Sequence, residues 1–501
     1  MAEAIEVVCH AVVTKFSGLT QIAENVESAM STSMSRTQTV TAMLRPSPTL
    51  VLVTTSLGVL LAQLDSMIVN FALKAIGSDL HAGVSALQWV LDIYNLVYAS
   101  LLLTGGTLGD LYGRRRAFAG GAGLIALGSV ICGLAPDTAT LIIGRGVTGL
   151  GAALVVPTSL AILAAAYPNP RERAHAVGIW ASCNGLALAL GPTAGGLLVD
   201  SAGWRSIFLL TVPLALFCLV MALRTVPESA DPRGRHLDLP GQALAISALA
   251  ALAYAAIEGS RAAWLSLPIL GALGLAVTAG AAFFWVEART QGALVPLDIL
   301  RHRALLPALG VAGLMTFGMY GMLFLMPVYL QAARGASSFV AALELLPVSA
   351  TFLIVSNLSG PLFNRFGPRF MTTAGMAFMG LGLLIPASLP SDAPLLAIMA
   401  GLFVIGIGLG LNTGPVMSVA VAAVPPARSG TASGLANTAR MIGATLGVAV
   451  MGAVFAAYAG QSAADAATVT HGMKMALFVG GGGELLGALI AFCFIRRAAL
   501  S

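Results

Sequence analysis

The sequence has very little charge for its length. Only 9% of its 501 residues are Asp, Glu, Lys or Arg, whereas 57% are hydrophobic and 57 residues are glycine. A soluble globular domain carries about 25% charged residues. The net charge of +5 is therefore not the basic surface of a nucleic-acid-binding protein. The composition is typical of a protein embedded in lipid, where small residues let helices approach closely.

Several signatures of catalysis and cofactor binding are also missing from the sequence. No Gly-x-x-x-x-Gly-Lys-Ser/Thr loop for a nucleotide is present, and the Gly-Leu-Gly at Gly149 lies within an apolar run. The few cysteines have neither metal-ligand spacing nor the pattern of a disulfide framework: Cys9, Cys132, Cys183, Cys218 and Cys493. We expect no cofactor, no metal site and no catalytic residues, and hence a protein that is not an enzyme.

Long apolar runs fill most of the remaining chain. A transmembrane helix needs roughly 20 apolar residues, and about fourteen runs qualify. They lie near 50–72, 86–108, 117–135, 140–164, 176–199, 206–223, 240–258, 265–286, 305–330, 340–362, 371–389, 394–421, 431–458 and 473–495. The first 45 residues show no cleavable signal peptide. The sequence thus predicts an all-α membrane protein with many spans.

The distribution of basic residues predicts the orientation. If the N-terminus is cytoplasmic, 19 of the 26 Lys and Arg residues fall in cytoplasmic segments and five in outer segments. Cytoplasmic loops of membrane proteins carry such an excess, so we expect both termini in the cytoplasm and a multi-pass protein of the plasma (inner) membrane. The expected divisions are a flexible segment 1–49, a first half 50–223, a linker with two helices 224–304, a second half 305–495 and a tail 496–501.

Two predicted cytoplasmic loops resemble each other. The first reads GTLGDLYGRR from Gly106, and the second reads GPLFNRFGPR from Gly360. Four pairs match at the same offset of 254 residues: Gly106 with Gly360, Asp110 with Asn364, Gly113 with Gly367, and Arg115 with Arg369. The two halves thus behave as copies with two helices inserted between them. Internal repeats with a substrate site between them are the architecture of secondary transporters.

In four motifs the chain resembles the major facilitator superfamily, and within it the fourteen-helix drug:proton antiporters. The motifs are LDSMIVNFAL from Leu64, the loop from Gly106 that includes Arg114, RGVTGLGAA from Arg145, and GPTAGG from Gly191. The last stretch is the family's antiporter motif, here Gly191, Pro192, Gly195 and Gly196. Lys74 replaces a usual proline and Ala187 a usual glycine. The resemblance implies two pseudo-symmetric six-helix halves plus two inserted helices.

The resemblance also implies roles for the motif residues. Gly106, Asp110, Gly113, Arg114 and Arg115 would form a cytoplasmic gate, in which Asp110 accepts hydrogen bonds or pairs with an arginine in one conformation. Plain anchoring of the loop by its arginines is the alternative. The glycines and the proline of the antiporter motif would bend a helix and seal the cavity, or simply serve close helix packing.

Three ionisable residues fall within apolar spans of the first half. Asp65, Asp92 and Arg145 each lie roughly 8 to 10 Å from the predicted outer end of a different helix, at 1.5 Å per residue. Charged groups at such depth usually mark function. Asp65 is the predicted proton- and cation-responsive carboxylate, with Arg145 tuning it. Structural pairing of Asp65, or an Arg145 tie to backbone carbonyls, is the alternative.

Asp92 bears on the substrate. WVLDIYNLV, from Trp89, resembles the matching stretch in exporters of quaternary ammonium compounds, dyes and biguanides, which implies a role in binding cations. An interfacial position beside Trp89 and Tyr94 in an aromatic belt is the alternative. Further substrate-cavity candidates are Asn70, Tyr94, Asn95, Phe317, Tyr320 and Glu344. The Met- and aromatic-rich run around Phe317 suits variable apolar ligands, or faces lipid and neighbouring helices. Glu484 receives no role, because the implied fold puts its helix at the periphery.

The expected function is efflux of hydrophobic, cationic drugs by alternating access, with protons as the coupling ion. We expect the protein to work as a monomer in a lipid bilayer and to have no nucleic-acid partner. A dedicated exporter of one metabolite or self-made antibiotic is the second interpretation. A membrane-embedded enzyme or receptor is the remote third, because it would need a polar catalytic cluster or a sizeable soluble domain, and the sequence has neither.

Overall fold

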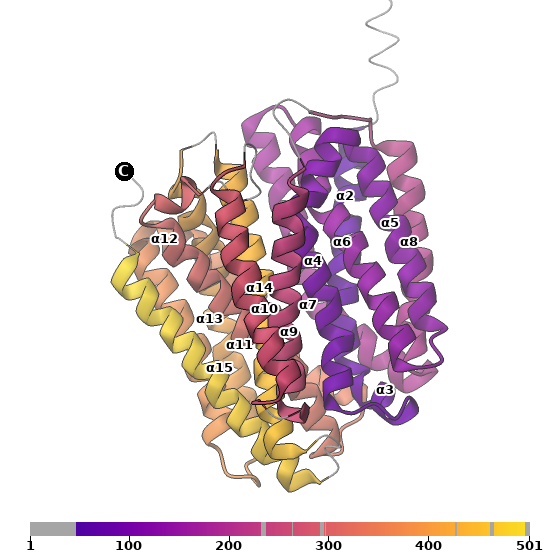
Figure 1. The fold of residues 1–501 in the computed structure, drawn as a ribbon, viewed down its shortest axis with the longest axis vertical. Helices are drawn as coiled ribbons and strands as arrows, with labels where there is room; N and C mark the ends of the chain where they lie inside the picture. Colours follow the sequence, from indigo (N-terminus) through magenta and orange to yellow (C-terminus); the bar gives the residue numbers. More distant parts are fainter. Residues whose placement is uncertain are drawn as a thin grey trace, which may run out of the picture. The chain divides into compact units, whose positions relative to one another are not determined.

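The computed structural model describes residues 47–231, 237–262, 264–290, 295, 297–425, 428–460 and 465–495 (Figure 1). Its long helices are α2 (Pro48–Ile68), α4 (Val84–Tyr112), α5 (Arg114–Gly133), α6 (Thr138–Ala166), α7 (Pro170–Ala202), α8 (Arg205–Thr225), α9 (Leu239–Ala262), α10 (Leu267–Glu287), α11 (Leu305–Ala332), α12 (Ser338–Ser388), α13 (Leu395–Ala422), α14 (Ser429–Ala459) and α15 (Ala466–Phe494). Short helices are η1 (Val69–Phe71), α3 (Leu73–Asp79) and η2 (Ile299–Arg301). Most of the predicted segment 1–49 and all of the tail 496–501 lie outside the described residues.

Glycines interrupt the helical backbone at matching places in the two halves. Gly113, between α4 and α5, has φ 112, and Gly367, within the 51-residue α12, has φ 79 and ψ 168. These conformations favour glycine, because a side chain would clash with the backbone. The two residues are one of the sequence-matched pairs, so the repeat extends to the backbone. α12 is therefore two helices that meet at Gly367, as the two predicted runs 340–362 and 371–389 require.

The described helices are long and apolar enough for a membrane. Thirteen of them qualify as candidate spans, and the break in α12 divides one of these in two. Large apolar side chains are exposed on the outward faces of α8 and α10, including Leu216, Phe217, Val277 and Trp285. Such faces need lipid around them rather than water. The all-helical, fourteen-span prediction is confirmed, while the orientation of the termini and the domain divisions stay predictions.

The helices pack as the repeat implies. Among α4–α8, the main pairings are α5 with α6 and α8, and α4 with α6. Among α11–α15, they are α12 with α13 and α15, and α11 with α14 and α15. The inserted helix α9 packs on α10 and also on α4 and α14 (Figure 1). Two seams join the groups: α4 with α14, and α7 with α12. We call the end with the Arg114–Arg116 loop the arginine-rich end.

Candidate functional site

A buried ion pair lies at the centre of the first half. The Arg145 guanidinium on α6 donates to the Asp65 carboxylate on α2, with Nη1 to Oδ2 at 2.6 Å, and both side chains are 1% exposed. The other carboxylate oxygen, Oδ1, has no hydrogen-bond partner among the described residues. Sequence depth alone brought these two residues to one level. The structure adds that they face each other, and that one acceptor is left over.

The guanidinium of Arg145 is held on two further sides. Its Nε donates to the Val90 carbonyl of α4 at 3.1 Å, and its carbon lies 4.5 Å from the centre of the Tyr94 ring. The Tyr94 hydroxyl in turn donates to the Ala62 carbonyl of α2 at 2.7 Å. A cation over an aromatic face is stabilised by the ring quadrupole, most strongly where water is excluded. Three helices, α2, α4 and α6, thus converge on one cation.

Asp92 does not join this ion pair. Its side chain is fully buried on α4, and neither carboxyl oxygen has a hydrogen-bond partner within the described parts of the chain. One turn earlier on α4, the Gln88 amide donates to the Val448 and Ala449 carbonyls of α14, at 3.1 Å each. Asp92 therefore lies inside the protein near the α4–α14 seam, not on a headgroup surface. Trp89, on another face, donates to Glu258 of α9 at 3.1 Å.

The register of the α4–α14 seam locates the surroundings of Asp92. The helices run antiparallel, since Gln88 meets the carbonyls of α14 residues 448 and 449, whereas Leu103 meets Gly434. This register sets Asp92 opposite the turn of Thr445, whose buried hydroxyl also lacks a partner among the described groups. Asn95, 4% exposed and one turn further, has an unpaired Oδ1 as well. The seam therefore holds several buried oxygens without donors.

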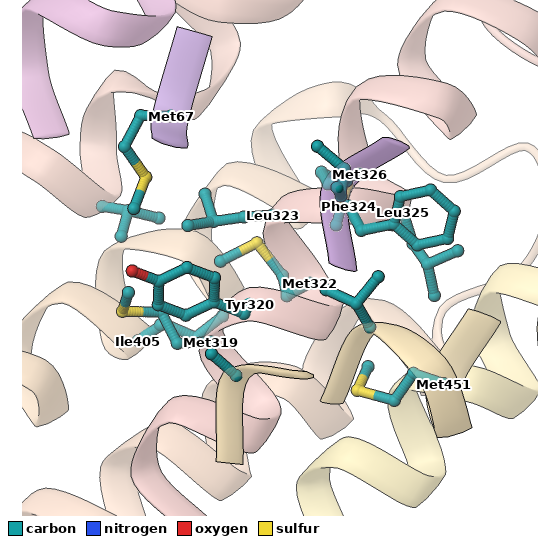
Figure 2. Close-up of a cluster of buried hydrophobic side chains, with 14 of the residues drawn as sticks. Met67, Met319, Tyr320, Met322, Leu323, Phe324, Leu325, Met326, Ile405 and Met451 are labelled. Carbon is teal, nitrogen blue, oxygen red and sulfur yellow. The ribbon is translucent and has the colours of Figure 1, made fainter. Parts of the chain in front are cut away.

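The other cavity candidates differ in their surroundings. The Asn70 amide donates to carbonyls of its own helical turn, Ser66 and Met67. Tyr320 is 7% exposed and lies in a methionine-rich cluster of α11 beside Met319 and Ile405 (Figure 2).

Phe317 and Glu344 complete the set. The Phe317 ring packs against Gly483 of α15, away from the ion pair. Glu344 on α12 is partly exposed, and its Oε2 has no partner in the described region. The Met and aromatic residues of α11 are mostly core residues, because Met315, Met322 and Phe324 are buried.

The predicted gate loop makes its polar contacts within the first half and the segment that follows it. Asp110 accepts from Arg114 at 2.9 Å, and the Asp110 carbonyl accepts from the Asp231 N–H. Glu228, which sequence reasoning missed, lies 3.7 Å from Arg115 and 3.6 Å from Arg116. The loop is thus tied to the segment that follows α8. A run of arginines at the end of a span was the only sequence signal for such an acidic partner.

The second copy of the loop has weaker contacts. Asn364 is exposed, in keeping with its missing charge. Arg369 stacks on the Phe492 ring of α15 at 4.3 Å, and its Nε has no partner among the described residues. Gly360 has open space around it.

The antiporter stretch gives α7 room for two neighbours. A Cβ on Gly191 would lie 2.8 Å from the Met67 Cβ, and one on Gly195 would lie 2.6 Å from Ile68, both on α2. A Cβ on Gly196 would lie 2.6 Å from the Ser338 carbonyl of α12. These glycines therefore let α7 approach α2 in its own half and α12 in the other half. Pro192 lies within the same helix.

At the end opposite the arginine-rich end, hydrogen bonds join the two halves. The Asp200 carboxylate at the end of α7 accepts from the Ser338 and Phe339 N–H groups, at 3.0 and 2.8 Å. Lys74 donates to the Gln331 carbonyl at 2.7 Å at this end, and further along the α7–α12 seam the Ser349 hydroxyl donates to the Leu188 carbonyl at 2.9 Å. Asp200 was not among the predicted residues, because its partner is backbone 138 residues away in sequence.

Toward the arginine-rich end, α7 and α12 part. A Cβ built on Gly185 would still lie 2.8 Å from the Leu353 side chain, whereas one built on Gly178 or on Gly360 would find no atom within 4 Å. The antiparallel register would otherwise set Gly178 opposite Gly360. The described conformation is therefore closed at one end of the α7–α12 seam and open at the arginine-rich end. A small hollow lined by Tyr167 and His175 also lies at this end, but no predicted site residue lines it.

Two repeated helix groups, one of which holds a buried ion pair, with a seam between them that is open at one end, have the architecture of a membrane transporter. A model of the Major Facilitator Superfamily matches residues 55–448, and the chain belongs to this superfamily. The multidrug resistance protein Stp of Mycobacterium tuberculosis is 42% identical over 409 residues, covering 82% of this chain and 76% of that protein. The methylenomycin A resistance protein of Streptomyces coelicolor is 34% identical, covering 88% and 91%.

Solved structures share the fold at low identity. A peptide transporter POT in complex with sulfate has a TM-score of 0.65 at 17% identity, covering 89% of this chain and 94% of that one. A bacterial homologue of the lysosomal transporter Spinster has a TM-score of 0.64 at 19% identity, covering 89% and 96%. Together, the family match, the relatives and the apolar helices show a multi-pass transporter of the inner membrane that handles small molecules, as the sequence predicted.

Proposed function

We propose that the protein exports hydrophobic, cationic compounds in exchange for protons, as a monomer that works by alternating access. The Asp65–Arg145 ion pair carries this proposal. Its carboxylate lies deep among three helices and has one oxygen, Oδ1, without a hydrogen-bond partner among the described residues. Ionisable residues inside a membrane protein mark ion or substrate pathways. Relatives named for multidrug resistance and drug efflux support drug-like substrates.

The ion pair suggests how a proton and a cation compete. Ionised Asp65 presents Oδ1 to a cation that arrives through the open arginine-rich end, which the positive-inside rule predicts to be cytoplasmic. A proton that reaches Asp65 from the other side removes the negative charge, so the cation is released there. Arg145 limits the attraction, since it already neutralises part of the carboxylate charge. Substrate and proton therefore take turns at one group.

The gate loop and the opposite-end contacts would alternate. We infer that Asp110, now paired with Arg114, exchanges partners when the arginine-rich end closes, while the Asp200 contacts break. An ionised carboxylate forms its strongest hydrogen bonds with charged donors or helix N-terminal N–H groups. Both ends thus use contacts that are strong enough to hold one state and few enough to break.

A dedicated exporter of one metabolite or self-made antibiotic is the second candidate. It is favoured by the relatives named for resistance to methylenomycin A and puromycin and for tetracenomycin C resistance and export. Uptake of a compound panel by energised inside-out vesicles separates the two: a broad profile of lipophilic cations supports multidrug export, and one transported compound class supports the dedicated exporter.

The decisive experiment compares Asp65→Asn with the wild-type protein in vesicles with and without a pH gradient. We expect Asp65→Asn to lose proton-driven efflux of a cationic dye while the protein stays in the membrane. The double variant Asp65→Asn with Arg145→Gln serves as the control, because it removes both charges together. Unchanged dye efflux that a protonophore still collapses would overturn the role of Asp65.

A further inference from the structure

Another fully buried carboxyl group lies outside the candidate site. Glu484 on α15 is 0% exposed, and neither Oε accepts a hydrogen bond of normal geometry from the residues that the structure describes. α15 has an exposed apolar face, with Leu486, Leu489 and Phe492, as expected for a peripheral helix. Glu484, however, points to the opposite face, toward the interior of the second half.

The carboxyl group lies against the backbone of α11. A Cβ added to Gly318 would overlap Oε1 of Glu484, so only glycine leaves space for the carboxyl group there. In α15, Gly483 directly precedes Glu484 and faces the Phe317 ring of α11. Gly480, one turn earlier, faces the Met451 side chain of α14. The missing side chains at Gly318 and Gly483 let the two helices enclose the acid.

No charged group shares this space among the described residues. The side chains of α11, α12 and α14 that meet this part of α15 include Phe317, Leu314, Met376, Leu383, Leu384 and Met451, and none of these titrates. Arg369 of α12 stacks on Phe492, two turns further along α15. Arg440 of α14 lies within electrostatic range of Tyr98 and Tyr320 instead. Glu484 therefore differs from Asp65, which has an arginine at 2.6 Å.

The surroundings decide the protonation state. A carboxylate without a charged partner in an apolar interior loses its hydration and gains too little in return, and the group takes up a proton instead. While α15 is closed on α11, Glu484 is thus a neutral acid. Its ionisation requires water or a partner, and hence an opening of the contact between Gly318 and Glu484. The four glycines Gly310, Gly313, Gly318 and Gly321 favour bending of α11 at this level.

The internal repeat relates the position of Glu484 to that of Asp65 in the first half. With the offset of 254 residues, the counterpart of Asp65 in α2 is Met319 in α11, the residue next to Gly318. The second half thus has an apolar side chain where the first half has its acid. Glu484 brings a carboxyl group to the same level of the helix from α15 instead. Both halves thereby hold a buried carboxyl group at this level of their first helix.

We propose that Glu484 is a second proton-binding site, occupied while α15 is closed on α11 and emptied when the two helices part. The inference rests on the proposed proton coupling only for its role in the transport cycle, not for the site itself. In that cycle, Glu484 gives the second half a proton of its own, in addition to the proton that competes with substrate at Asp65.

The site can be tested without transport. Infrared spectroscopy of the purified full-length protein in lipid bilayers, titrated with pH, detects protonated carboxyl groups by their C=O stretch, and isotope-labelled glutamate separates Glu from Asp. We expect a Glu band that persists at pH values where ordinary carboxyl groups are ionised. Glu484→Gln should remove this band, whereas Glu344→Gln, which changes a partly exposed acid in α12, should keep it.

A persistent Glu band that survives Glu484→Gln, or the absence of such a band in the labelled wild-type protein, would overturn the site. The labelled wild-type measurement needs no variant, so poor folding of Glu484→Gln leaves the test in force. Proton release per substrate in proteoliposomes then tests the coupling role, and Glu484→Gln should lower this ratio. If the protein does not transport at all, the proposed function fails while the infrared result still stands or falls by itself.

Discussion

Asp65 and Asp92, both buried in the first half, should respond differently to neutralisation. Asp65→Asn leaves the Arg145 charge buried and without its carboxylate, and breaking a buried ion pair in this way costs about 3–5 kcal/mol. Asp92→Asn removes an acid that has no partner in the described structure, so the free energy of unfolding should stay the same or rise. Thermal unfolding of the purified variants in detergent measures both effects.

The double variant Asp65→Asn with Arg145→Gln refines this prediction. It should recover much of the lost stability, because no unpaired charge remains, but it should not recover proton-driven transport. Equal destabilisation by Asp65→Asn and Asp92→Asn would contradict the difference in partners.

Asp92→Asn should change which substrates are exported. The unpaired carboxyl group at the α4–α14 seam can ionise when a cationic substrate reaches it and supplies a partner, so its loss should reduce efflux of dicationic compounds more than that of monocationic ones. Efflux assays with matched pairs of mono- and dicationic dyes measure the ratio. Equal losses for both classes would indicate a structural role for Asp92.

At this scale the sequence predicted the depth of Asp65, Asp92 and Arg145 but not their azimuth. Apolar runs on every side of a membrane helix carry almost no periodic signal, so the face of a residue is set by packing. Glu484 shows the same limit in reverse. Its helix was correctly expected at the periphery, but whether the acid faced lipid or protein depended on Gly318, 166 positions away in the sequence.

At the scale of elements, the α7–α12 seam depends on one carboxylate. Asp200 accepts from two N–H groups at the start of α12, which would otherwise be unsatisfied at the helix N-terminus. Asp200→Ala should remove these bonds and shift the population away from the described state. Spin-label distances between the two halves at that end should lengthen or broaden in the variant.

Asp79→Ala is the matched control for Asp200→Ala. Asp79 is also an acid at the same end, where Arg205, with help from Trp204, holds its pKa below its usual range. Its partners belong to its own half, with Arg205 Nη1 at 2.6 Å and Trp204 Nε1 at 3.0 Å. Its loss should therefore leave the distance between the halves unchanged. Identical distance distributions in Asp200→Ala and wild-type protein would show that the seam does not depend on Asp200.

The elements themselves were the most predictable part of the molecule. Runs of roughly 20 apolar residues give long helices because the bilayer leaves no other way to satisfy the backbone. The repeat of two short loops paired Gly113 with Gly367, and the structure adds that both have positive φ. The packing of α9 could not be predicted in this way. It bonds to α4 at both ends, with Gln242 donating to the Ser100 carbonyl and Glu258 accepting from Trp89.

At the scale of the whole transporter, the two seams differ. α4 and α14 stay in contact from Gln88 to Leu103 and are covered by α9, whereas α7 and α12 separate beyond Gly185. Motion should therefore be largest between α7 and α12 at the arginine-rich end. Gly178 and Gly360 are the reporters for this motion, because both have open space in the described state and the register sets them opposite each other.

A cysteine pair at these two positions gives the last prediction. Gly178→Cys with Gly360→Cys, in a background without the accessible native cysteines, should cross-link only when the arginine-rich end closes. Conditions that close this end, such as a pH gradient with substrate present, should raise the cross-linking rate, and the cross-linked protein should stop transporting until it is reduced. Leu188→Cys with Ser349→Cys on the same two helices is the control, because Ser349 already contacts Leu188 in the described state. Fast cross-linking of both pairs under all conditions would show that α7 and α12 do not separate, and the alternating-access proposal would lose its moving seam.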